Sequence, residues 1–431
     1  MKKKLVLTAI ATLLLITVNA QTTFQKTFGG TSEDQGSSVQ QTSDGGYIIT
    51  GNTSSFGAGS DDVYLIKTDA NGNSLWTKTF EGIGYVQYGY CVKQTSDGGY
   101  IITGATNNFG LSYIVDVYLI KTDANGNSLW IKAFGGTNDD EWGHSVQQTT
   151  DGGYIIVGVT QSFGAGNNDV YLIKTDGNGN SLWTKTFGGT SQDEGYSVQQ
   201  TSDGGYIITG LSSSPDTGDP DVYLIKTDAN GNSLWTKTFG GASPDEGYSV
   251  QQTSDGGYII AGKTQSSGAS VHEVYLIKTD ANGNSLWTKT FGGGVGYQNY
   301  EESGYSVQQT SDGGYIIAGT TTVVSADDPD VYLIKTDGNG NVGVDEFWVS
   351  GFGFQIYPNP TTGKFIVSNT NHQSPTTNIC IYNVLGEKVY ATSNFKQQTS
   401  YEIDLSNSPK GIYFVKIYVE EKFYTEKMVI Q

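Results

Sequence analysis

The sequence predicts an all-β protein in which a four-stranded unit is repeated, and three observations lead to this fold class. The first is composition: 59 glycines and 28 tyrosines accompany only 8 prolines in 431 residues, as expected for many short strands joined by tight turns. The second is a repeat of about fifty residues, a period typical of propellers and arrays. The third is that the two ends of the repeat array complement each other.

The tetrapeptide Asp-Gly-Gly-Tyr marks the repeat. It begins at Asp44, Asp97, Asp151, Asp203, Asp255 and Asp312. In the fourth unit the predicted strands are 197–201, 206–209, 222–226 and 233–239. The turns Ser-Asp-Gly-Gly and Asp-Ala-Asn-Gly-Asn contain the Asp-Gly and Asn-Gly pairs of tight hairpins. Strands two and three are almost continuously apolar, which indicates a sheet covered on both faces.

The ends of the array predict a closed ring. The sixth unit has Val342-Gly-Val-Asp-Glu346 where a fourth strand should follow, whereas residues 22–28, Thr-Thr-Phe-Gln-Lys-Thr-Phe, are a fourth strand without its unit. This orphan strand, five complete sets and a final set of three supply six four-stranded blades. We therefore expect residues 21–341 to form a six-bladed β-propeller closed by the N-terminal strand. An open solenoid, the alternative, needs no complementary ends.

A tryptophan recurs in the fourth strand, after the Asp-Ala-Asn-Gly-Asn turn or its Asp-Gly-Asn-Gly-Asn form. The five residues are Trp76, Trp130, Trp183, Trp235 and Trp287. The segment resembles the tryptophan-docking motif of quinoprotein-type propellers, with the turn one residue shorter. This resemblance implies that each indole wedges between blades. It implies no quinone, because no second element that would hold one is recognisable.

The first twenty residues have the pattern of a secretory signal. Lys2, Lys3 and Lys4 precede an apolar stretch, and Asn19-Ala20 is a small-residue cleavage site. The alternative is a membrane anchor, but the stretch is shorter than the roughly 20 residues of a spanning helix. We expect residues 1–20 to be removed and the mature protein to have no transmembrane segment.

Charge and cysteine content exclude two further classes. The formal net charge is −19, the acidic excess lies in residues 21–351, and the chain has no arginine. Such a surface repels nucleic acid and lacks the bidentate donor that phosphate favours, so we expect no nucleic-acid partner. The two cysteines, Cys91 and Cys380, fall in different predicted domains. A disulfide framework is therefore not expected, and each cysteine is most simply a small core residue.

Beyond residue 354 the repeat stops. The segments Tyr357-Pro358-Asn359-Pro360-Thr-Thr-Gly363, 381–389 (Ile-Tyr-Asn-Val-Leu-Gly-Glu-Lys-Val) and 427–431 (Lys-Met-Val-Ile-Gln) resemble the type A sorting domain of the type IX (Por) secretion system of Bacteroidetes. The resemblance implies a small immunoglobulin-like β-sandwich over residues 354–431 that the outer-membrane machinery reads and usually cleaves. Residues 342–353 are the expected linker. The protein would then pass through the periplasm and be secreted or displayed on the outer cell surface.

The sequence contains no recognisable catalytic motif. The three histidines are His144, His272 and His372; they are scattered, and we expect nothing to pair them. No nucleophile elbow, zinc spacing or phosphate loop is present, so we predict no catalytic residue, no metal ligand set and no cofactor. The Asp-Ala-Asn-Gly-Asn turn raises calcium as an alternative, but its glycine is fourth rather than sixth, which favours an Asx-stabilised hairpin.

The candidate binding site lies on the variable loops that enter strand one of each unit. The residues proposed to bind a ligand are Asp34, Glu141, Asp193, Asp245, Glu302, Tyr88, Trp142 and Tyr300. Acids around a channel with aromatic residues nearby suit a sugar or a divalent cation. The alternative is that each carboxylate caps its own turn. A second set of acids precedes strand three and is expected to cap turns or bond to the next blade. Its members are Asp62, Asp116, Asp169, Asp221, Glu273 and Asp330.

Two functions remain compatible with these features. The first is a non-catalytic surface module for binding or adhesion, monomeric, with a glycan or protein ligand and the type IX machinery as partners. The second is a secreted carbohydrate-active hydrolase or lyase, because glycosidase chemistry needs only two carboxylates. Nearly every acid recurs in most repeats, which favours a structural role for the acids and hence the binding module.

Overall fold

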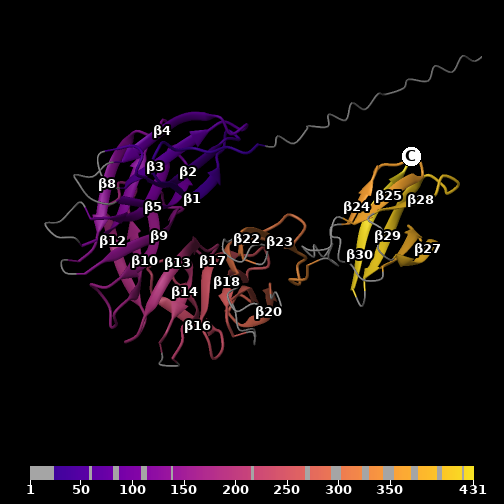
Figure 1. Ribbon diagram of the computed structural model, residues 1–431. Coiled ribbons are helices and arrows are strands. Elements are labelled where there is room, and N and C mark those ends of the chain that lie inside the picture. Colours follow the sequence, from indigo (N-terminus) through magenta and orange to yellow (C-terminus); the bar gives the residue numbers. More distant parts are fainter. Residues whose placement is uncertain are drawn as a thin grey trace, which may run out of the picture. The chain divides into compact units, whose positions relative to one another are not determined.

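The computed structural model describes residues 24–57, 61–80, 87–107, 114–136, 139–214, 218–266, 272–292, 302–322, 330–342, 354–369, 377–395, 400–419 and 422–431. These residues form strands and turns and no helix, so the described chain is all-β as predicted (Figure 1). In this part of the chain no helix has the length and apolar content to cross a membrane. The chain divides into two compact units, residues 1–309 with 317–320 and residues 310–316 with 321–431.

The first unit contains five four-stranded antiparallel sheets with their strands in chain order, consistent with propeller blades. We call them blades 1 to 5. Blades 1 and 2 consist of β1 Asp34–Gln41, β2 Tyr47–Thr53, β3 Asp62–Thr68 and β4 Ser74–Phe80, then β5 Gln87–Gln94, β6 Tyr100–Thr106, β7 Asp116–Thr122 and β8 Ser128–Phe134. Blades 3 and 4 consist of β9 Glu141–Gln148, β10 Tyr154–Thr160, β11 Asp169–Thr175 and β12 Ser181–Phe187, then β13 Asp193–Gln200, β14 Tyr206–Ser212, β15 Asp221–Thr227 and β16 Ser233–Phe239. Blade 5 consists of β17 Asp245–Gln252, β18 Tyr258–Thr264, β19 Glu273–Thr279 and β20 Ser285–Phe291.

The sixth sheet has three strands, β21 Ser303–Gln309, β22 Tyr315–Thr321 and β23 Asp330–Thr336. Residues 24–28, expected as its fourth strand, form no strand in the structure. The physical reason is that a strand forms only with hydrogen bonds to a neighbouring strand. The described strand pairings give residues 24–28 no such partner, and the sheet of β23 has three strands. The first strands of consecutive sheets lie against one another from β1 through β5, β9, β13 and β17 to β21. These first strands are therefore the inner strands of the array.

Each hairpin turn is held by an aspartate, as the turn chemistry predicts. In blade 4, Asp203 Oδ1 accepts hydrogen bonds from Thr201 Oγ1 at 2.6 Å and from the Gly205 amide at 3.0 Å. Gly204 has φ +84°, a conformation that favours glycine. In the second turn Asp228 Oδ1 accepts from the amides of Asn230 and Asn232. This turn is the expected Asx-stabilised hairpin.

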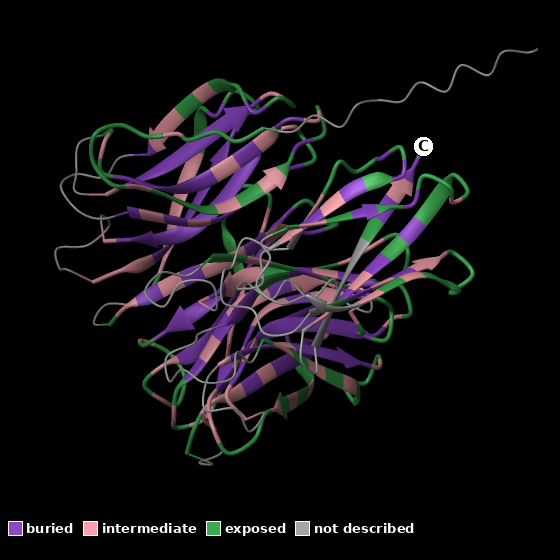
Figure 2. Cartoon of the chain, turned by 45° about the vertical axis from the view of Figure 1, so that its right-hand side comes forward, coloured by how far each residue is buried: buried purple, intermediate pink, exposed green. Residues whose placement is uncertain are grey.

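The core of the first unit lies between neighbouring blades, whose middle strands are buried (Figure 2). We call the two surfaces that meet the leading face and the trailing face. Between blades 4 and 5 the leading face is Ile207, Val222 and Leu224, and the trailing face is Val250, Tyr258, Ile260 and Ile277. The same seven positions, with Val157 in addition, form the core between blades 3 and 4. Burial on both faces explains why strands two and three are apolar throughout.

The tryptophans of the fourth strands pack against the next blade. The Trp183 ring lies 6.0 Å from the Tyr206 ring in an edge-on arrangement, and a Cβ on Gly231 would stand 2.6 Å from the indole. Trp76, Trp130 and Trp235 make the same ring contact at 5.8–5.9 Å. Trp287 holds the equivalent position in β20.

The C-terminal part of the second unit is a β-sandwich. One sheet has the order β24-β25-β28 and the other β27-β26-β29-β30. The strands are β24 Phe354–Tyr357, β25 Lys364–Asn369, β26 Thr377–Asn383, β27 Lys388–Phe395, β28 Ser400–Asp404, β29 Gly411–Val419 and β30 Lys422–Ile430. Side chains from both sheets form one core that includes Phe365, Ile381, Ile403 and Val415. Cys380 is partly exposed, whereas Cys91 is buried in the first unit.

The proline-rich motif follows β24, as expected for residues that cannot donate to a ladder. Both the Tyr357-Pro358 and the Asn359-Pro360 peptide bonds are cis. The Asn359 amide donates to the Lys427 carbonyl at 2.7 Å and accepts from the Val429 amide at 3.0 Å. Gly363 has φ +108° and lies against the backbone of Ser406. The motif is therefore fixed to the last strand of the sandwich.

Candidate functional site

The acids predicted to ring a channel lie at the entrances of the inner strands. Asp34, Glu141, Asp193 and Asp245 begin β1, β9, β13 and β17, and Glu302 immediately precedes β21. All except Asp34 are at most 1% exposed. They are buried within the loops instead of forming an open acidic rim.

Hydrogen bonds tie these carboxylates to the loops before them. Asp193 Oδ2 accepts from the Gly189 amide at 2.8 Å, and Asp245 Oδ2 accepts from the Gly241 amide at 3.0 Å and Ser266 Oγ at 2.7 Å. Glu141 accepts from the Gly136 amide and from Thr160 Oγ1, each at 2.9 Å. Each of these acids thus caps the loop before it through one carboxylate oxygen.

The aromatic residues that were predicted to bind a ligand are less buried than these acids. Tyr88 and Trp142 are partly exposed on β5 and β9. Tyr300 lies outside the described residues. The Tyr88 ring stacks on that of Tyr90, with ring centres 5.9 Å apart and planes at 11°.

This stack is the start of a continuous series of aromatic rings along the inner strands, which we call the aromatic belt. Its members are Tyr88, Tyr90, His144, Tyr196, Tyr248 and Tyr305. Successive ring centres lie 5.2–5.9 Å apart. Five of these residues are half-buried, and Tyr305 is exposed. The expectation that nothing pairs the histidines is wrong for His144, which contacts Tyr90 and Tyr196.

Four belt residues occupy β-bulges of the inner strands. The pairing of β13 with β14 skips from Gly195 to Ser197, so Tyr196 has no direct partner. The same skip leaves out Tyr90, His144 and Tyr248. A bulge re-aims a side chain and is common next to binding sites. The sequence signal for this site is an aromatic residue directly after the recurring inner-strand glycine, present in five of six units, and our sequence reasoning missed it.

Glutamate side chains accept hydrogen bonds from two hydroxyl groups of the belt. The Tyr196 hydroxyl donates to Glu194 Oε2 and the Tyr248 hydroxyl to Glu246 Oε2, both at 2.7 Å. Lys263 Nζ lies 3.1 Å from Glu246 Oε1 and 5.9 Å from the centre of the Tyr248 ring. The belt therefore combines ring faces with carboxylate acceptors and one cation.

The belt groups that titrate are held in their neutral forms. Burial lowers the pKa of His144 to about 4, although the Glu194 carboxylate acts in the opposite direction. Burial also raises the pKa of Tyr90 to about 12, and burial and Glu194 raise that of Tyr196. At neutral pH His144 is an uncharged imidazole, and Tyr90 and Tyr196 are protonated phenols. Such groups suit hydrogen bonding and stacking better than proton transfer.

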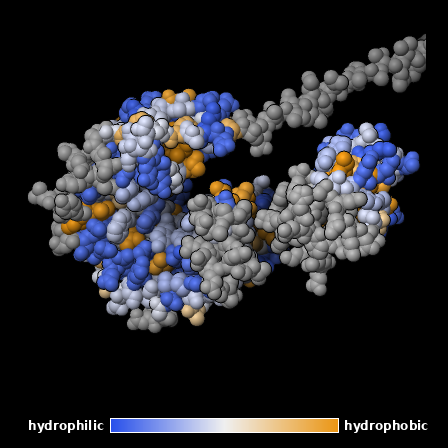
Figure 3. Space-filling view, viewed as in Figure 1, coloured by the Kyte–Doolittle hydropathy of each residue, from blue (hydrophilic) through white to orange (hydrophobic). Residues whose placement is uncertain are grey.

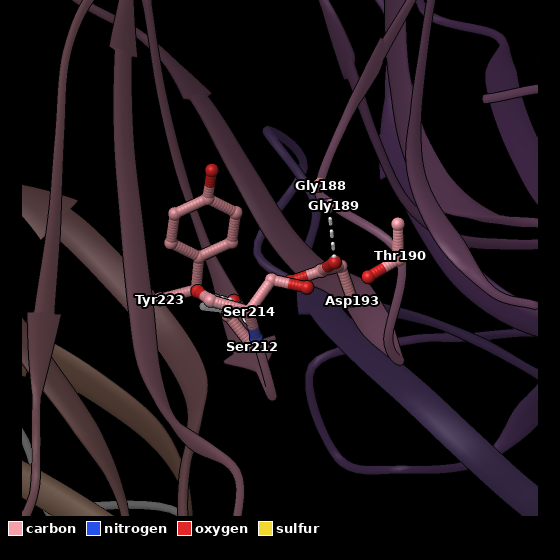
Figure 4. A pocket seen from close by; sticks show the side chains of 7 residues that line it. All are labelled: Gly188, Gly189, Thr190, Asp193, Ser212, Ser214 and Tyr223. Atoms are coloured by element: carbon pink, nitrogen blue, oxygen red, sulfur yellow. Dashed lines mark hydrogen bonds between the residues drawn. The ribbon is translucent and has the colours of Figure 1, made fainter. Parts of the chain in front are cut away.

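A pocket of about 390 Å³ opens beside the entrance of β13 (Figure 4). It is lined by Gly188, Gly189, Thr190, Asp193, Ser212, Ser214 and Tyr223. Its polar groups are thus a carboxylate and several hydroxyls. Within the described residues, no group of three or more histidine, cysteine, aspartate or glutamate side chains is placed to hold a metal ion.

The fold and these sites define an all-β protein with repeated propeller-like sheets. More particularly, residues 355–431 match the family described as the secretion system C-terminal sorting domain. This tail directs export by type IX secretion to the cell surface or the extracellular space.

Similarity elsewhere in the chain is weak. The regulatory protein FlaEY of Caulobacter vibrioides is 27% identical over 152 residues, which are 30% of this chain and 16% of that protein. Sqt1 from Chaetomium thermophilum has a TM-score of 0.40 and 10% identity, covering 92% of this chain and 96% of its own. A puromycin hydrolase has a TM-score of 0.43 and 11% identity, covering 80% of this chain and 51% of its own.

Proposed function

We propose that the chain is an exported, non-catalytic binding module whose aromatic belt binds an extracellular glycan. The observation that carries this proposal is the unbroken series of ring contacts on the inner strands. A sugar has an apolar C–H face that stacks on an aromatic ring, and a rim of hydroxyls that donate to carboxylates. Glu194 and Glu246 lie beside the rings as such acceptors.

The length of the belt favours an oligosaccharide over a single sugar. Successive rings come from neighbouring blades at 5.2–5.7 Å, so a chain of sugars would meet one ring after another. Hydrolysis of a glycan would need a pair of free carboxylates, whereas the two carboxylates beside the belt are bound to its hydroxyl groups. Binding without turnover is accordingly the function we propose, in place of hydrolysis.

The test is a glycan array with the purified mature protein, read beside a hydrolysis screen on the same glycans. We expect selective retention of one class of oligosaccharide and no release of shorter products. Cleavage of a retained glycan would replace the proposal with the hydrolase alternative. Retention of no glycan, together with binding to an extracellular protein, would move the ligand to the protein class.

We also propose that the array closes as a six-bladed ring. Val331 and Leu333 of the sixth sheet are 87% and 65% exposed, whereas their counterparts Val222 and Leu224 are 0% exposed. At the other end Val39 of β1 is 63% exposed, but Val250 of blade 5 only 6%. Hydrophobic atoms are visible on the first sheet in Figure 3. An unused leading face and an unused trailing face are the two halves of the repeated interface, and a heterologous interface forms a ring when it closes.

The N-terminal segment supports the same closure. A Cβ on Gly72 of blade 1 would stand 2.4 Å from the Phe24 ring, which lies 5.7 Å from the Tyr47 ring. Lys26 Nζ donates to Asn73 Oδ1 at 3.2 Å. The tryptophan and lysine of each fourth strand make these contacts with the next blade, for example Lys185 with Asn232. Phe24 and Lys26 thus make the contacts expected of the outer strand of a blade that precedes blade 1.

The domain limits follow from these proposals. We assign residues 1–20 to a cleaved signal, 21–341 to the propeller, 342–353 to the linker and 354–431 to the sorting domain. The cleavage positions would be read from the N- and C-terminal sequences of the secreted protein.

A further inference from the structure

Two acids meet at three of the described interfaces between consecutive blades, one from the start of strand three and one from the start of the next inner strand. Between blades 3 and 4, a Cβ on Gly188 would stand 2.4 Å from Asp169 Oδ1 and 2.6 Å from Asp193 Oδ2. Between blades 4 and 5, a Cβ on Gly240 would stand 2.0 Å from Asp221 Oδ1 and 2.4 Å from Asp245 Oδ2. Each glycine is required because two carboxylate oxygens fill the space beside it.

Asp169, Asp193 and Asp245 are buried and Asp221 is half-buried, and three of the four acids are incompletely satisfied. Asp193 and Asp245 are 0% exposed. The Oδ1 atoms of Asp193, Asp221 and Asp245 are buried and have no hydrogen-bond partner. Among the described ion pairs, no lysine reaches any of the four acids. A third pair, Asp116 with Glu141, has the same geometry around Gly135.

Two carboxylates that lie beside the same glycine carry like charges. Without a counter-charge, such a pair is strongly unfavourable when it is buried. The pKa directions agree, since burial and then Asp245 raise the pKa of Asp221, and burial raises that of Asp169. The interface therefore needs a positive charge between the carboxylates. The candidates are a shared proton and a bound cation.

The surroundings of Asp193 favour a cation. Its carboxylate faces the pocket of about 390 Å³, in which Thr190, Ser212 and Ser214 supply hydroxyl oxygens (Figure 4). A pocket lined by oxygen atoms with no nitrogen or sulfur ligand suits a hard cation, and its volume admits the ion with its remaining water ligands. A protein exported to the cell surface also meets far more calcium than a cytosolic one.

We propose that the Asp169–Asp193 pair, with the hydroxyl-lined pocket beside it, binds Ca²⁺, and that the Asp221–Asp245 pair is a second Ca²⁺ site between blades. Each ion bridges two blades and joins them through its ligands. Affinities in the range of extracellular modules, about 10⁻⁴–10⁻³ M, are expected.

One interface of the same chain carries only one of the two charges. The position equivalent to Asp193 is Gln87 in blade 2, opposite Asp62 of blade 1. A neutral amide removes the like-charge repulsion and the second anionic ligand. The proposal therefore assigns no ion to the interface between blades 1 and 2.

The test uses terbium as the probe, because tyrosine sensitises its emission and Tyr223 lines the pocket. For the full mature chain we expect tyrosine-excited Tb³⁺ emission that Ca²⁺ displaces, and a higher melting temperature in about 1 mM Ca²⁺ than in EDTA. Asp193→Asn should weaken Tb³⁺ binding at least about tenfold. Asp219→Asn, which removes an exposed carboxylate nearby, is the matched control and should bind as the wild type does.

Equal melting temperatures in Ca²⁺ and EDTA, with no displaceable emission, would overturn the proposal and leave a shared proton as the counter-charge. Equal weakening by Asp219→Asn would reduce the effect to surface charge and overturn it as well. Because the wild-type titration needs no variant, a misfolded Asp193→Asn protein would not block the test.

Discussion

At the scale of single residues, the Asp-Gly-Gly-Tyr repeat is explained by one buried lysine in each of blades 1 to 5. In blade 4, Lys226 Nζ lies 2.9 Å from Asp203 Oδ2, and it donates to the Thr227 carbonyl, also at 2.9 Å. The lysine is buried, but the aspartate is more than half exposed. Burial opposes ionisation of Asp203, yet hydrogen bonds from Thr201, Lys226 and Gly205 outweigh it and hold its pKa at about 2.

Removing this carboxylate should therefore destabilise the fold. We expect Asp203→Asn to lower the free energy of unfolding by about 1–2 kcal/mol, because the buried ammonium loses its counter-ion while the exposure of Asp203 limits the loss. Since the folded-state pKa lies below the ordinary 3.8, the stabilisation is complete above pH 4 and is lost as the pH falls towards 2. Urea unfolding at pH 7 and pH 3 measures both effects.

The neighbouring Ser202→Ala is the control. Ser202 donates a hydrogen bond to Gln252 through its backbone amide, and this substitution keeps that amide. The account of this ion pair would be wrong if Asp203→Asn matched Ser202→Ala at pH 7. It would also be wrong if the difference between wild type and Asp203→Asn were the same at both pH values.

At the scale of strands and turns, local chemistry in the sequence was sufficient to predict most elements. The Asp-Gly and Asn-Gly turns located the hairpins, and apolar runs located strands two and three within one to three residues of their observed bounds, such as β14 Tyr206–Ser212. The inner strands begin earlier than predicted, at residues such as Asp193. The reason is that a buried acid starts the strand, and isolated acids are not typical of strand interiors.

The candidate site was predicted less well, because it depends on contacts between blades. The acids at the loop entrances were identified from the sequence as a recurring set. Their burial was not predicted, because it arises when the glycine loops fold over them, and this contact leaves no pattern in the local sequence. The aromatic belt was not predicted. A bulge at Tyr196 or Tyr248 changes the direction of one side chain, but it does not change the sequence pattern by which the strand is recognised. His144 was unremarkable in sequence and is meaningful only beside its ring partners.

At the scale of the whole molecule, the chain combines an export signal with a repeat array whose two ends are complementary. The tail of residues 355–431 delivers the protein to the cell surface or beyond. An array that kept its end faces open would expose apolar surface there, and open heterologous contacts between copies lead to filaments. The proposed closure within one chain would remove this hazard.

Closure has a clear signature in stability. If the sixth sheet meets blade 1, Leu333 is buried as Leu224 is, and Leu333→Ala should cost about 2–5 kcal/mol. Leu234, which is 58% exposed on the outer strand β16, is the matched control, and Leu234→Ala should change stability by less than about 0.5 kcal/mol. Chemical denaturation of both variants makes the comparison. Two equally small changes would leave the array open.

The measurement that tests the central claim most directly is the affinity of the mature protein for its array-selected oligosaccharide, by calorimetry, after single substitutions in the aromatic belt. Tyr196→Ala and Tyr248→Ala should each weaken binding at least about tenfold, because each removes a stacking face and a hydroxyl bound to its carboxylate. Tyr248→Phe, which keeps the ring, should lose less, and the outer-strand Leu234→Ala should bind as the wild type does. Wild-type affinity in both alanine variants, with their melting temperatures unchanged, would contradict the claim that the belt is the ligand site.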